Sequence, residues 1–334
     1  MFRPTFRTVL AVVLAASLLA ACGGSSGGSS GSSGEKTKLT ASYSELVPDE
    51  LGPWGAADGG YFSRNGLDVS LTSVSSTNGV AALLSGQVQL AQLGGSEVLS
   101  AAAGGADVQI IANLCPYYPY LFMSSSSITS LNELKGKKVG ISSFGGSSDT
   151  ATRTALRKEG LSPDSDVTIV PTGSSSNRIA ALRSGSIQAG MSQPPESVTL
   201  QKDGFRPLLD LAKLKLPAAN TVLAVRKSWA SSHHSEVQAY VDSLVQAVAR
   251  ERKDKEFTWN VLAKWQKLKD RSSLDQTYAF YMNEVFQAYP YPQAAQFADA
   301  VQVGQKKNSK LAGFNVAGAL DDSYVKNAAN RKLG

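Results

Sequence analysis

Short apolar runs alternate with helix-like stretches over the first two thirds of the chain. The runs at 66–71, 108–114 and 139–141 have the length and apolar character of strands in a buried sheet. The stretches at 75–86 and 147–160 each start with serine and stop at a glycine, as many helices do. This alternation predicts an α/β fold.

After Trp229 the pattern becomes that of helices alone. Apolar positions form one stripe at helical spacing from Val237 to Val248 and another from Val261 to Leu268. Further helical stretches are expected at 274–289 and 292–305. Because such stripes usually pack against a core, we expect these helices to support the α/β part rather than to carry chemistry.

The sequence contains an internal repeat with an offset of about 99 residues. Residues 75–89 match residues 174–188 almost position by position, and Glu97 aligns with Glu196. This period is longer than that of stacked repeat arrays, so it predicts two similar α/β units in tandem. Two such units leave a cleft between them, and ligands of open α/β sheets bind at the carboxyl ends of the strands.

The N-terminal residues have the pattern of a targeting segment. Arg3 and Arg7 precede an apolar run at 8–20, and the small residues that lead into Cys22 resemble a bacterial lipobox. The resemblance implies cleavage before Cys22 and acylation of its thiol. The alternative is a plain signal peptide with an incidental cysteine.

A stretch made only of glycine and serine follows Cys22 and ends at Gly34, which predicts a flexible tether. We therefore expect a lipoprotein signal peptide at 1–21 and a tether at 22–34. The protein would then be exported and lipid-anchored to the outer face of the bacterial cell membrane, with its folded part starting near Glu35.

Charge and residue usage argue against several classes of protein. The formal net charge of +6 is modest and its basic residues are scattered, so no nucleic-acid partner is expected. His233 and His234 are the only histidines and lie beyond the repeat, and no His/Cys cluster has the spacing of a metal site. We expect no metal, no cofactor and no enzyme activity. With Cys22 lipidated, Cys115 has no disulfide partner.

Residues 138–150 combine a short strand, a loop of glycines and hydroxyls, and the start of a helix. Ser147 or Ser148 is the expected N-cap. Backbone N–H groups and hydroxyls would then converge at the positive end of the helix dipole, which suits a small ligand. An ordinary, well-capped turn between strand and helix is the alternative.

A tyrosine-rich segment lies between the two units of the repeat. Tyr117, Tyr118 and Tyr120 alternate with prolines on a stretch that we expect to be extended. Their rings could face a ligand, or they could pack at the connection between the units. The sequence leaves both possibilities open.

Several motifs, taken in order, resemble those of ABC-transporter solute-binding proteins of the nitrate/sulfonate/taurine type, a family that also includes thiamine-pyrimidine binders. They are the lipobox with its tether and the segments 59–69, 83–89, 131–140 and 181–189. The resemblance implies a two-lobed periplasmic-binding-protein type II fold, with two hinge strands and a ligand cleft between the lobes. The chain departs from the family where it has glutamine, at 89 and 188, in place of a frequent aspartate.

The resemblance also implies a division into lobes and a set of partners. Residues 35–124 and 221–334 would form lobe 1, and residues 125–220 would form lobe 2. A monomer of this kind would close on a small-molecule solute and deliver it to an ABC permease driven by ATPase subunits.

The ligand positions implied by the resemblance lie on loops at strand ends, on the tyrosine segment and on the start of the helix at 147. The candidate ligand-binding residues are Ser42, Tyr43, Ser44, Trp54, Gly94, Ser96, Tyr117, Tyr118, Ser143, Phe144, Gly145, Gly146, Ser147, Ser148, Thr150, Gln193 and Glu196.

The sequence leaves the charge of the ligand open. Helix N-termini favour an anion such as a sulfonate or nitrate, yet the predicted loops hold carboxylates and no arginine or lysine. Those carboxylates are Glu45, Glu97, Asp149 and Glu196. They either favour a neutral or amine-bearing aromatic or pyrimidine ligand stacked on a nearby ring, or they complement helix dipoles. A surface lipoprotein sensor that binds a partner protein is a further hypothesis.

Overall fold

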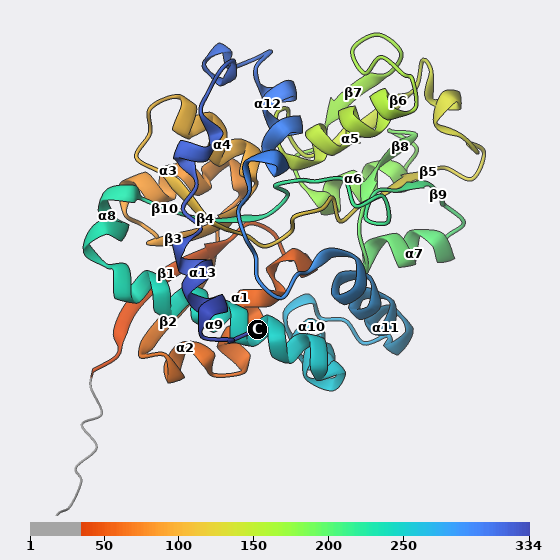
Figure 1. Ribbon diagram of the computed structural model, residues 1–334. Coiled ribbons are helices and arrows are strands. Elements are labelled where there is room, and N and C mark those ends of the chain that lie inside the picture. The colour runs from red at the N-terminus through yellow and green to blue at the C-terminus, as the bar shows by residue number, and fades with distance from the viewer. Residues whose placement is uncertain (1–34) are drawn as a thin grey trace, which may run out of the picture. The chain divides into compact units, whose positions relative to one another are not determined.

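The computed structural model describes residues 35–334. The predicted signal peptide, the lipidation site at Cys22 and the tether lie outside this part. Ten strands of the described residues form two five-stranded sheets, each in its own lobe (Figure 1). The mixed α/β fold with two lobes that the sequence predicts is thereby confirmed.

The sheet of lobe 1 has the strand order β2-β1-β3-β10-β4. Its strands are β1 (Thr37–Tyr43), β2 (Leu67–Ser73), β3 (Leu90–Leu93), β4 (Gln109–Asn113) and β10 (Val222–Val225). Strands β1, β2 and β3 run parallel, whereas β10 is antiparallel to its neighbours β3 and β4.

The sheet of lobe 2 has the equivalent order β7-β6-β8-β5-β9. Its strands are β5 (Leu121–Ser124), β6 (Lys138–Ile141), β7 (Thr168–Pro171), β8 (Ala189–Ser192) and β9 (Arg206–Asp210). Here β5 takes the antiparallel place that β10 has in lobe 1. In each lobe, therefore, the antiparallel strand comes directly after the chain has crossed from the other lobe.

Helices cover both sheets, and those of the repeat occupy equivalent places. In lobe 1 they are η1 (Pro48–Glu50), α1 (Leu51–Asp58), α2 (Tyr61–Arg64), α3 (Ser76–Ser85) and α4 (Gly95–Ala103). In lobe 2 they are η2 (Leu131–Leu134), α5 (Ser147–Lys158), α6 (Ser175–Arg183) and α7 (Glu196–Lys202). The succession β2-α3-β3-α4 recurs as β7-α6-β8-α7, so the internal repeat of the sequence is a repeat of the fold.

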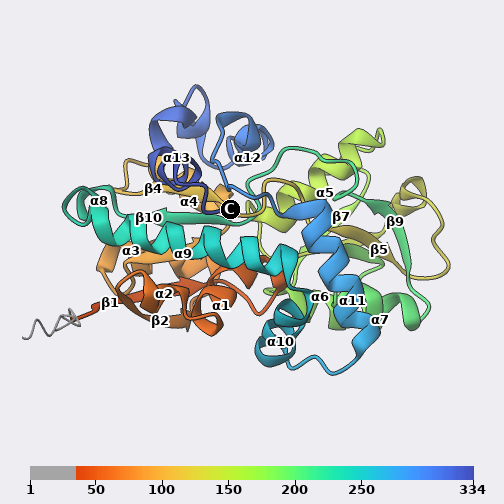
Figure 2. The same ribbon diagram turned by 60° about the horizontal axis from the view of Figure 1, so that its bottom comes forward.

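The helices after β10 complete the described part. They are α8 (Lys227–Ser232), α9 (His234–Lys253), α10 (Lys255–Gln266), α11 (Arg271–Phe280), η3 (Tyr281–Val285), η4 (Ala294–Phe297), α12 (Ala298–Gly304), η5 (Ser309–Leu311), η6 (Val316–Ala319) and α13 (Ser323–Asn330). Figure 2 shows α9 running beside α1 and α2, and its predicted apolar stripe is buried in the core of lobe 1. Helix α12 instead contacts both α4 and α5, so it bridges the two lobes.

Two crossover segments join the lobes and pair with each other. The bridge between Tyr117 and Pro217 is antiparallel, and the Ala218 N–H donates to the Pro116 carbonyl at 2.8 Å. Strand β5 belongs to the sheet of lobe 2, although the predicted division after residue 124 assigned it to lobe 1. The sheets therefore put the first crossover before Leu121, because the strand after it pairs at once with β8 and β9.

Within residues 35–334, no helix combines the length and the apolar character that crossing a membrane requires.

Candidate functional site: the cleft between the lobes

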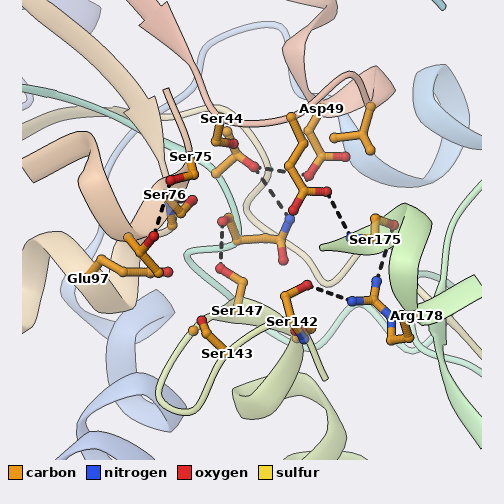
Figure 3. Close-up of a pocket in the computed structure, with 18 of the residues that line it drawn as sticks. Ser44, Asp49, Ser75, Ser76, Glu97, Ser142, Ser143, Ser147, Ser175 and Arg178 are labelled. Atoms are coloured by element: carbon orange, nitrogen blue, oxygen red, sulfur yellow. Dashed lines mark hydrogen bonds between the residues drawn. The ribbon is translucent and has the colours of Figure 1, made fainter. Parts of the chain in front are cut away.

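A cavity lies where the two lobes face each other, with about 670 Å³ of empty space including its opening to solvent (Figure 3). The two crossovers supply part of its wall, and most of the wall comes from the segments that follow six parallel strands, β1, β2 and β3 of lobe 1 and β6, β7 and β8 of lobe 2. These are the carboxyl ends of the strands, where open α/β sheets bind ligands. Serine and threonine hydroxyls supply much of the lining, and three carboxyl groups and one guanidinium join them.

Four helix N-termini border the cavity, and two of them are already occupied by protein groups. At α6 the Ser175 N–H donates to the Glu45 carboxylate at 3.3 Å. At α4 the Gly95 N–H donates to the Ala219 carbonyl at 3.1 Å. The α3 and α5 N-termini face the cavity from opposite lobes, through Ser76 and Ser147 respectively. Since the first N–H groups of a helix have no partner within it, these two ends can bind an anionic group.

The loop before α5 is held by its own side chains. Gly146 is the N-cap of α5, so neither Ser147 nor Ser148 has the predicted capping role. The Ser148 hydroxyl instead accepts a hydrogen bond of 2.9 Å from the Ser142 N–H, and the Asp149 carboxylate accepts one of 2.8 Å from the Gly145 N–H. Side chains from the first turn of α5 thus hold the loop that precedes the helix. Ser143 and Ser147 lie at the cavity wall.

Asp49 joins both lobes and the second crossover through four hydrogen bonds. Its Oδ1 accepts from Tyr281 at 2.6 Å and from Gln193 of lobe 2 at 3.1 Å. Its Oδ2 accepts from Asn220 at 2.6 Å and Thr221 at 3.0 Å. Burial raises the pKa of this carboxyl to about 6, while the hydrogen bonds oppose the shift. Asp49 is therefore ionised above neutral pH and organises the floor of the cavity.

Glu45 and Glu97 are the other two acids of the lining. Burial raises the pKa of Glu45, and the nearby Arg178 guanidinium opposes this. Burial raises the pKa of Glu97 to about 7, and its Oε2 is buried without a hydrogen-bond partner. Glu45 thus complements a helix dipole, as does Asp149 beside the loop, whereas Glu97 retains an unused acceptor.

Arg178 is a cavity residue that the sequence analysis missed. Its guanidinium donates to the Met191 carbonyl at 2.6 Å and to the Ser142 and Ser175 hydroxyls at 2.7 and 3.3 Å. Figure 3 shows it beside Ser142 and Ser175. The repeat contained a signal for it, because Arg178 stands where Gly79 stands in the first unit.

Two strand glycines make room for the Arg178 side chain. A Cβ atom at Gly190 of β8 would lie 3.1 Å from Arg178 Cδ, and one at Gly140 of β6 would lie 3.3 Å from its Cγ. The side chain therefore passes over the sheet of lobe 2 where these strands carry no side chains. Such glycines within apolar strands are a usable sequence signal for a close approach.

The cavity wall includes seven of the candidate residues. They are Ser44, Gly94, Ser143, Gly146, Ser147, Ser148 and Gln193. Sequence analysis did not select several other lining residues, among them Asp49, Ser75, Ser76, Ser175, Asn220 and Thr221. Most of these lie in the repeated serine stretch or the second crossover, which were identified as structural features but not as ligand positions.

The aromatic candidates lie outside the cavity wall. Trp54 is fully buried and stacks on Trp265 with ring centroids 5.3 Å apart, and Tyr43 meets both rings edge-on. The Tyr117 hydroxyl accepts from Gln287, and that of Tyr118 donates to Asp299 at 3.0 Å. Neither of these two tyrosines lines the cavity. Of the tyrosine segment, Tyr120 alone lines the cavity.

The remaining candidates are close to the cleft without lining it. Ser42 is buried in β1, and Phe144 and Gly145 lie on the outer part of their loop. Ser96 and Thr150 approach each other across the lobes, with 3.4 Å between their hydroxyl oxygens. Glu196, the repeat partner of Glu97, has a buried Oε2 but does not line this cavity.

The two lobes, the paired crossovers and the cleft at the strand ends define a periplasmic-binding-protein type II fold. Residues 48–254, more than half of the chain, match the family model described as NMT1/THI5 like. The chain belongs to this family. No curated protein matches its sequence.

Solved structures of binding proteins share the fold at low sequence identity. The alkanesulfonate-binding protein SsuA from Xanthomonas axonopodis pv. citri, bound to MOPS, matches with a TM-score of 0.71 and 20% identity, over 87% of this chain and 100% of that chain. The periplasmic aliphatic sulphonate binding protein SsuA from Escherichia coli matches with a TM-score of 0.69 and 20% identity, over 85% and 97%. The periplasmic nitrate-binding protein NrtA from Synechocystis PCC 6803 matches with a TM-score of 0.73 and 14% identity, over 89% of each.

Proposed function

We propose that the protein is the substrate-binding component of an ABC importer, which captures a small organic solute in the cleft and delivers it to a membrane permease. The observation that carries this proposal is the cavity itself. It lies between two lobes joined by two paired crossovers, and its wall combines hydroxyls, side-chain amides and two open helix N-termini. Such a wall can hold a polar solute and release it when the lobes separate.

The open N-termini of α3 and α5 support an anionic group on the solute, as in a sulfonate. The similar structures described above support the same view, because two are of sulfonate-binding proteins and one is of a nitrate-binding protein. Stacking of an aromatic pyrimidine on Trp54 or Tyr118 receives no support, since both rings are packed elsewhere. A binding role is supported by the three similar structures described above, which are all of binding proteins.

A thermal-shift screen of the purified protein tests the proposal. The panel contains alkyl and aryl sulfonates, nitrate, bicarbonate, aminopyrimidines and amines. A ligand at a hundred times its Kd stabilises a protein by about 2.7 kcal/mol, which raises the Tm by several degrees. We expect such a rise with at least one small solute. No rise with any of them would contradict the proposal and favour a lipoprotein sensor that binds a partner protein.

We also propose that the protein is a lipid-anchored monomer on the outer face of the cell membrane. The lipobox-like sequence at Cys22 and the Gly/Ser stretch after it support the lipid anchor, and the monomer is what the resemblance to solute-binding proteins implies. Metabolic labelling with a fatty-acid analogue is expected to label the protein, and the label should be lost when Cys22 is replaced by alanine. Equal labelling of both, or no labelling of either, would contradict acylation of this thiol.

A further inference from the structure

The Glu97 carboxyl lies at the boundary between the lobes, in a space that two glycines leave free. A Cβ atom at Gly94 of lobe 1 would overlap Oε2 of Glu97, and one at Gly146 of lobe 2 would lie 3.1 Å from Oε1. Oε2 is buried and has no hydrogen-bond partner among the described residues. A carboxylate that loses its water without gaining a donor is costly, so this position favours the neutral, protonated carboxyl.

The same carboxyl adjoins the two helix N-termini that are open to an anion. Gly146 is the N-cap of α5 and has no side chain with which to accept from the first N–H groups. The Ser147 hydroxyl lies beside the space at Gly94, because a Cβ atom there would be 2.9 Å from its Oγ. The Ser76 hydroxyl of α3 accepts from the Gly94 N–H at 3.2 Å. Figure 3 shows both serines on the same side of the cavity as Glu97.

An anion at these N-termini is compatible with Glu97 only if the carboxyl keeps its proton. An ionised carboxylate in a desolvated cleft would repel a neighbouring anion. A protonated carboxyl has an O–H donor and can instead bind the anion, as neutral carboxylic acids do in apolar sites. Burial already raises the pKa of Glu97 to about 7, and the negative charge of a bound anion would raise it further.

The charged groups around Glu97 leave this preference in place. Of the elements that pack against α4, neither α3 nor β4 nor η6 has an ionisable residue. On α5, Asp149 and Arg153 form an ion pair of 2.7 Å with each other. Asp299 on α12 and the exposed Lys310 on η5 are the other charged residues of these elements nearest to α4. Burial is the cause of the raised pKa of Glu97, and none of these groups contributes to it.

The other charged groups of the cavity wall already have protein partners. Arg178 donates to three protein oxygens, and Asp49 accepts four hydrogen bonds. Glu45 accepts from the Ser175 N–H. Glu97 is therefore the carboxyl of this wall that remains available to a solute.

We propose that Glu97 binds an anionic solute in its protonated form and donates a hydrogen bond to the anion, so that each binding event takes up about one proton from the solvent. This inference rests on the proposed solute-binding function and adds to it a residue that makes binding depend on pH. When the lobes separate, the carboxyl meets water, and its ordinary pKa of 4.5 favours the ionised form. A rise in pH therefore favours the open protein without solute.

Calorimetric titration over a range of pH tests the inference. The probes are ethanesulfonate, benzenesulfonate and nitrate, which stay anionic throughout. Between pH 7 and 8.5 the affinity for a probe that binds should fall at least tenfold, since uptake of one proton corresponds to about tenfold per pH unit. Asp49, with a pKa of about 6, stays ionised over this range. Titrations at pH 7.5 in two buffers of different ionisation enthalpy, neither of them a sulfonate, should count roughly one proton taken up.

Two variants separate the effect of the proton from that of the hydrogen bond. Glu97→Gln keeps an N–H donor without a group that titrates, so its affinity should change less than about threefold between pH 7 and 8.5. At pH 8.5 it should bind at least as tightly as the parent protein. Glu97→Ala has no donor and should bind roughly tenfold more weakly than Glu97→Gln at pH 7 and 8.5 alike.

The matched control is Glu251→Gln, which removes another buried carboxyl of raised pKa, one that lies outside the cavity wall. It is expected to keep the full pH dependence. An affinity of the parent protein that stays constant from pH 7 to 8.5, or a fall that survives in Glu97→Gln, would overturn the inference. Loss of the pH dependence in Glu251→Gln would overturn it too, because the effect would then not be specific to Glu97.

The proton count on the parent protein decides even if a Glu97 variant fails to fold. Uptake of less than about half a proton per bound anion would contradict the inference. If none of the three anionic probes binds while another compound of the broader screen does, the inference fails and solute binding stands. If no compound binds at all, the proposed function fails as well.

Discussion

The carboxylate of Asp49 and the side-chain amide of Asn220 are joined by a hydrogen bond of 2.6 Å, which ties lobe 1 to the second crossover. The same carboxylate also accepts from Gln193, which follows β8 of lobe 2. One buried acid thus contacts both lobes and the segment that joins them. Its position explains how the floor of the cavity is kept in place without any disulfide among the described residues.

Asp49→Asn is therefore expected to destabilise the protein by roughly 2–4 kcal/mol at pH 7.5, because an amide nitrogen replaces an oxygen that accepts from buried donors. Thermal unfolding monitored by circular dichroism measures this loss. Asp203→Asn, which removes an exposed ion pair with Arg183, serves as the control and should cost less than about 1 kcal/mol. Equal stability of the two variants would show that Asp49 does not organise the cleft.

Arg178 supplies the only guanidinium of the cavity wall. Arg178→Met leaves three acceptors of lobe 2 without their donor and removes the charge nearest to Glu45. We expect roughly tenfold weaker binding or more for an anion-bearing solute, together with a loss of about 1–3 kcal/mol of stability. Arg183→Met, on the exposed side of the same helix α6, is the control and should change neither value appreciably. If Arg178→Met bound the solute as tightly as the parent protein does, Arg178 would not contribute to binding.

Replacement of Ser147 and Ser148 together by alanine tests the wall formed by the start of α5. The change removes two hydroxyls from the cavity. It also leaves the Ser142 N–H without the hydrogen bond that it donates to the Ser148 hydroxyl. We expect a roughly tenfold loss of affinity and a stability cost of only about 1 kcal/mol. Titration calorimetry and thermal unfolding of the same sample separate the two effects. Ser127→Ala, in an exposed loop, is the control, and equal affinity of both variants would argue against this wall as part of the site.

The sequence was sufficient to predict the architecture because serine and glycine residues mark the helix ends in both units of the repeat. A serine is the N-cap of both α3 and α6, and a glycine with positive φ ends each of them, Gly86 as the C-cap of α3 and Gly185 directly after the C-cap of α6. The sequence also singled out the loop before α5, several residues of which line the cavity. It could not show that Gly146 rather than a serine caps that helix, because Ser148 and Asp149 compete for the backbone groups of their own loop.

The structure places the aromatic candidates away from the cavity wall, and the reason is physical. Trp54 and Tyr118 are amphipathic side chains that suit a ligand wall as well as a core, and only tertiary contacts decide between the two. The contacts that bury them come from Trp265 and Asp299, more than 150 residues away in sequence. Asp49 was missed likewise, because its partners Gln193, Asn220 and Tyr281 are brought together only by the fold.

Glu251 offers a test of pH dependence that is independent of any ligand. Burial alone raises the pKa of this carboxyl from 4.5 to about 8, and neither of its oxygens has a hydrogen-bond partner. Between these values the folded protein keeps a proton that the unfolded chain has released, so stability falls as the pH rises. Glu251→Gln removes this effect. The variant should match the parent near pH 4.5 and exceed it by up to roughly 4 kcal/mol at pH 8.5, since one pKa unit corresponds to about 1.4 kcal/mol. If the difference in unfolding free energy between the two proteins stayed the same across this pH range, the raised pKa of Glu251 would be contradicted.

Hydrogen–deuterium exchange, followed by mass spectrometry with and without the best solute from the screen, tests the central claim most directly. A solute held between the lobes should slow exchange at the starts of α3 and α5 together, in peptides that cover 75–79 and 143–150. Protection should also appear around the crossover at 217–221. Slowed exchange on one lobe only, or at segments away from the cleft, would contradict a binding site formed by both lobes.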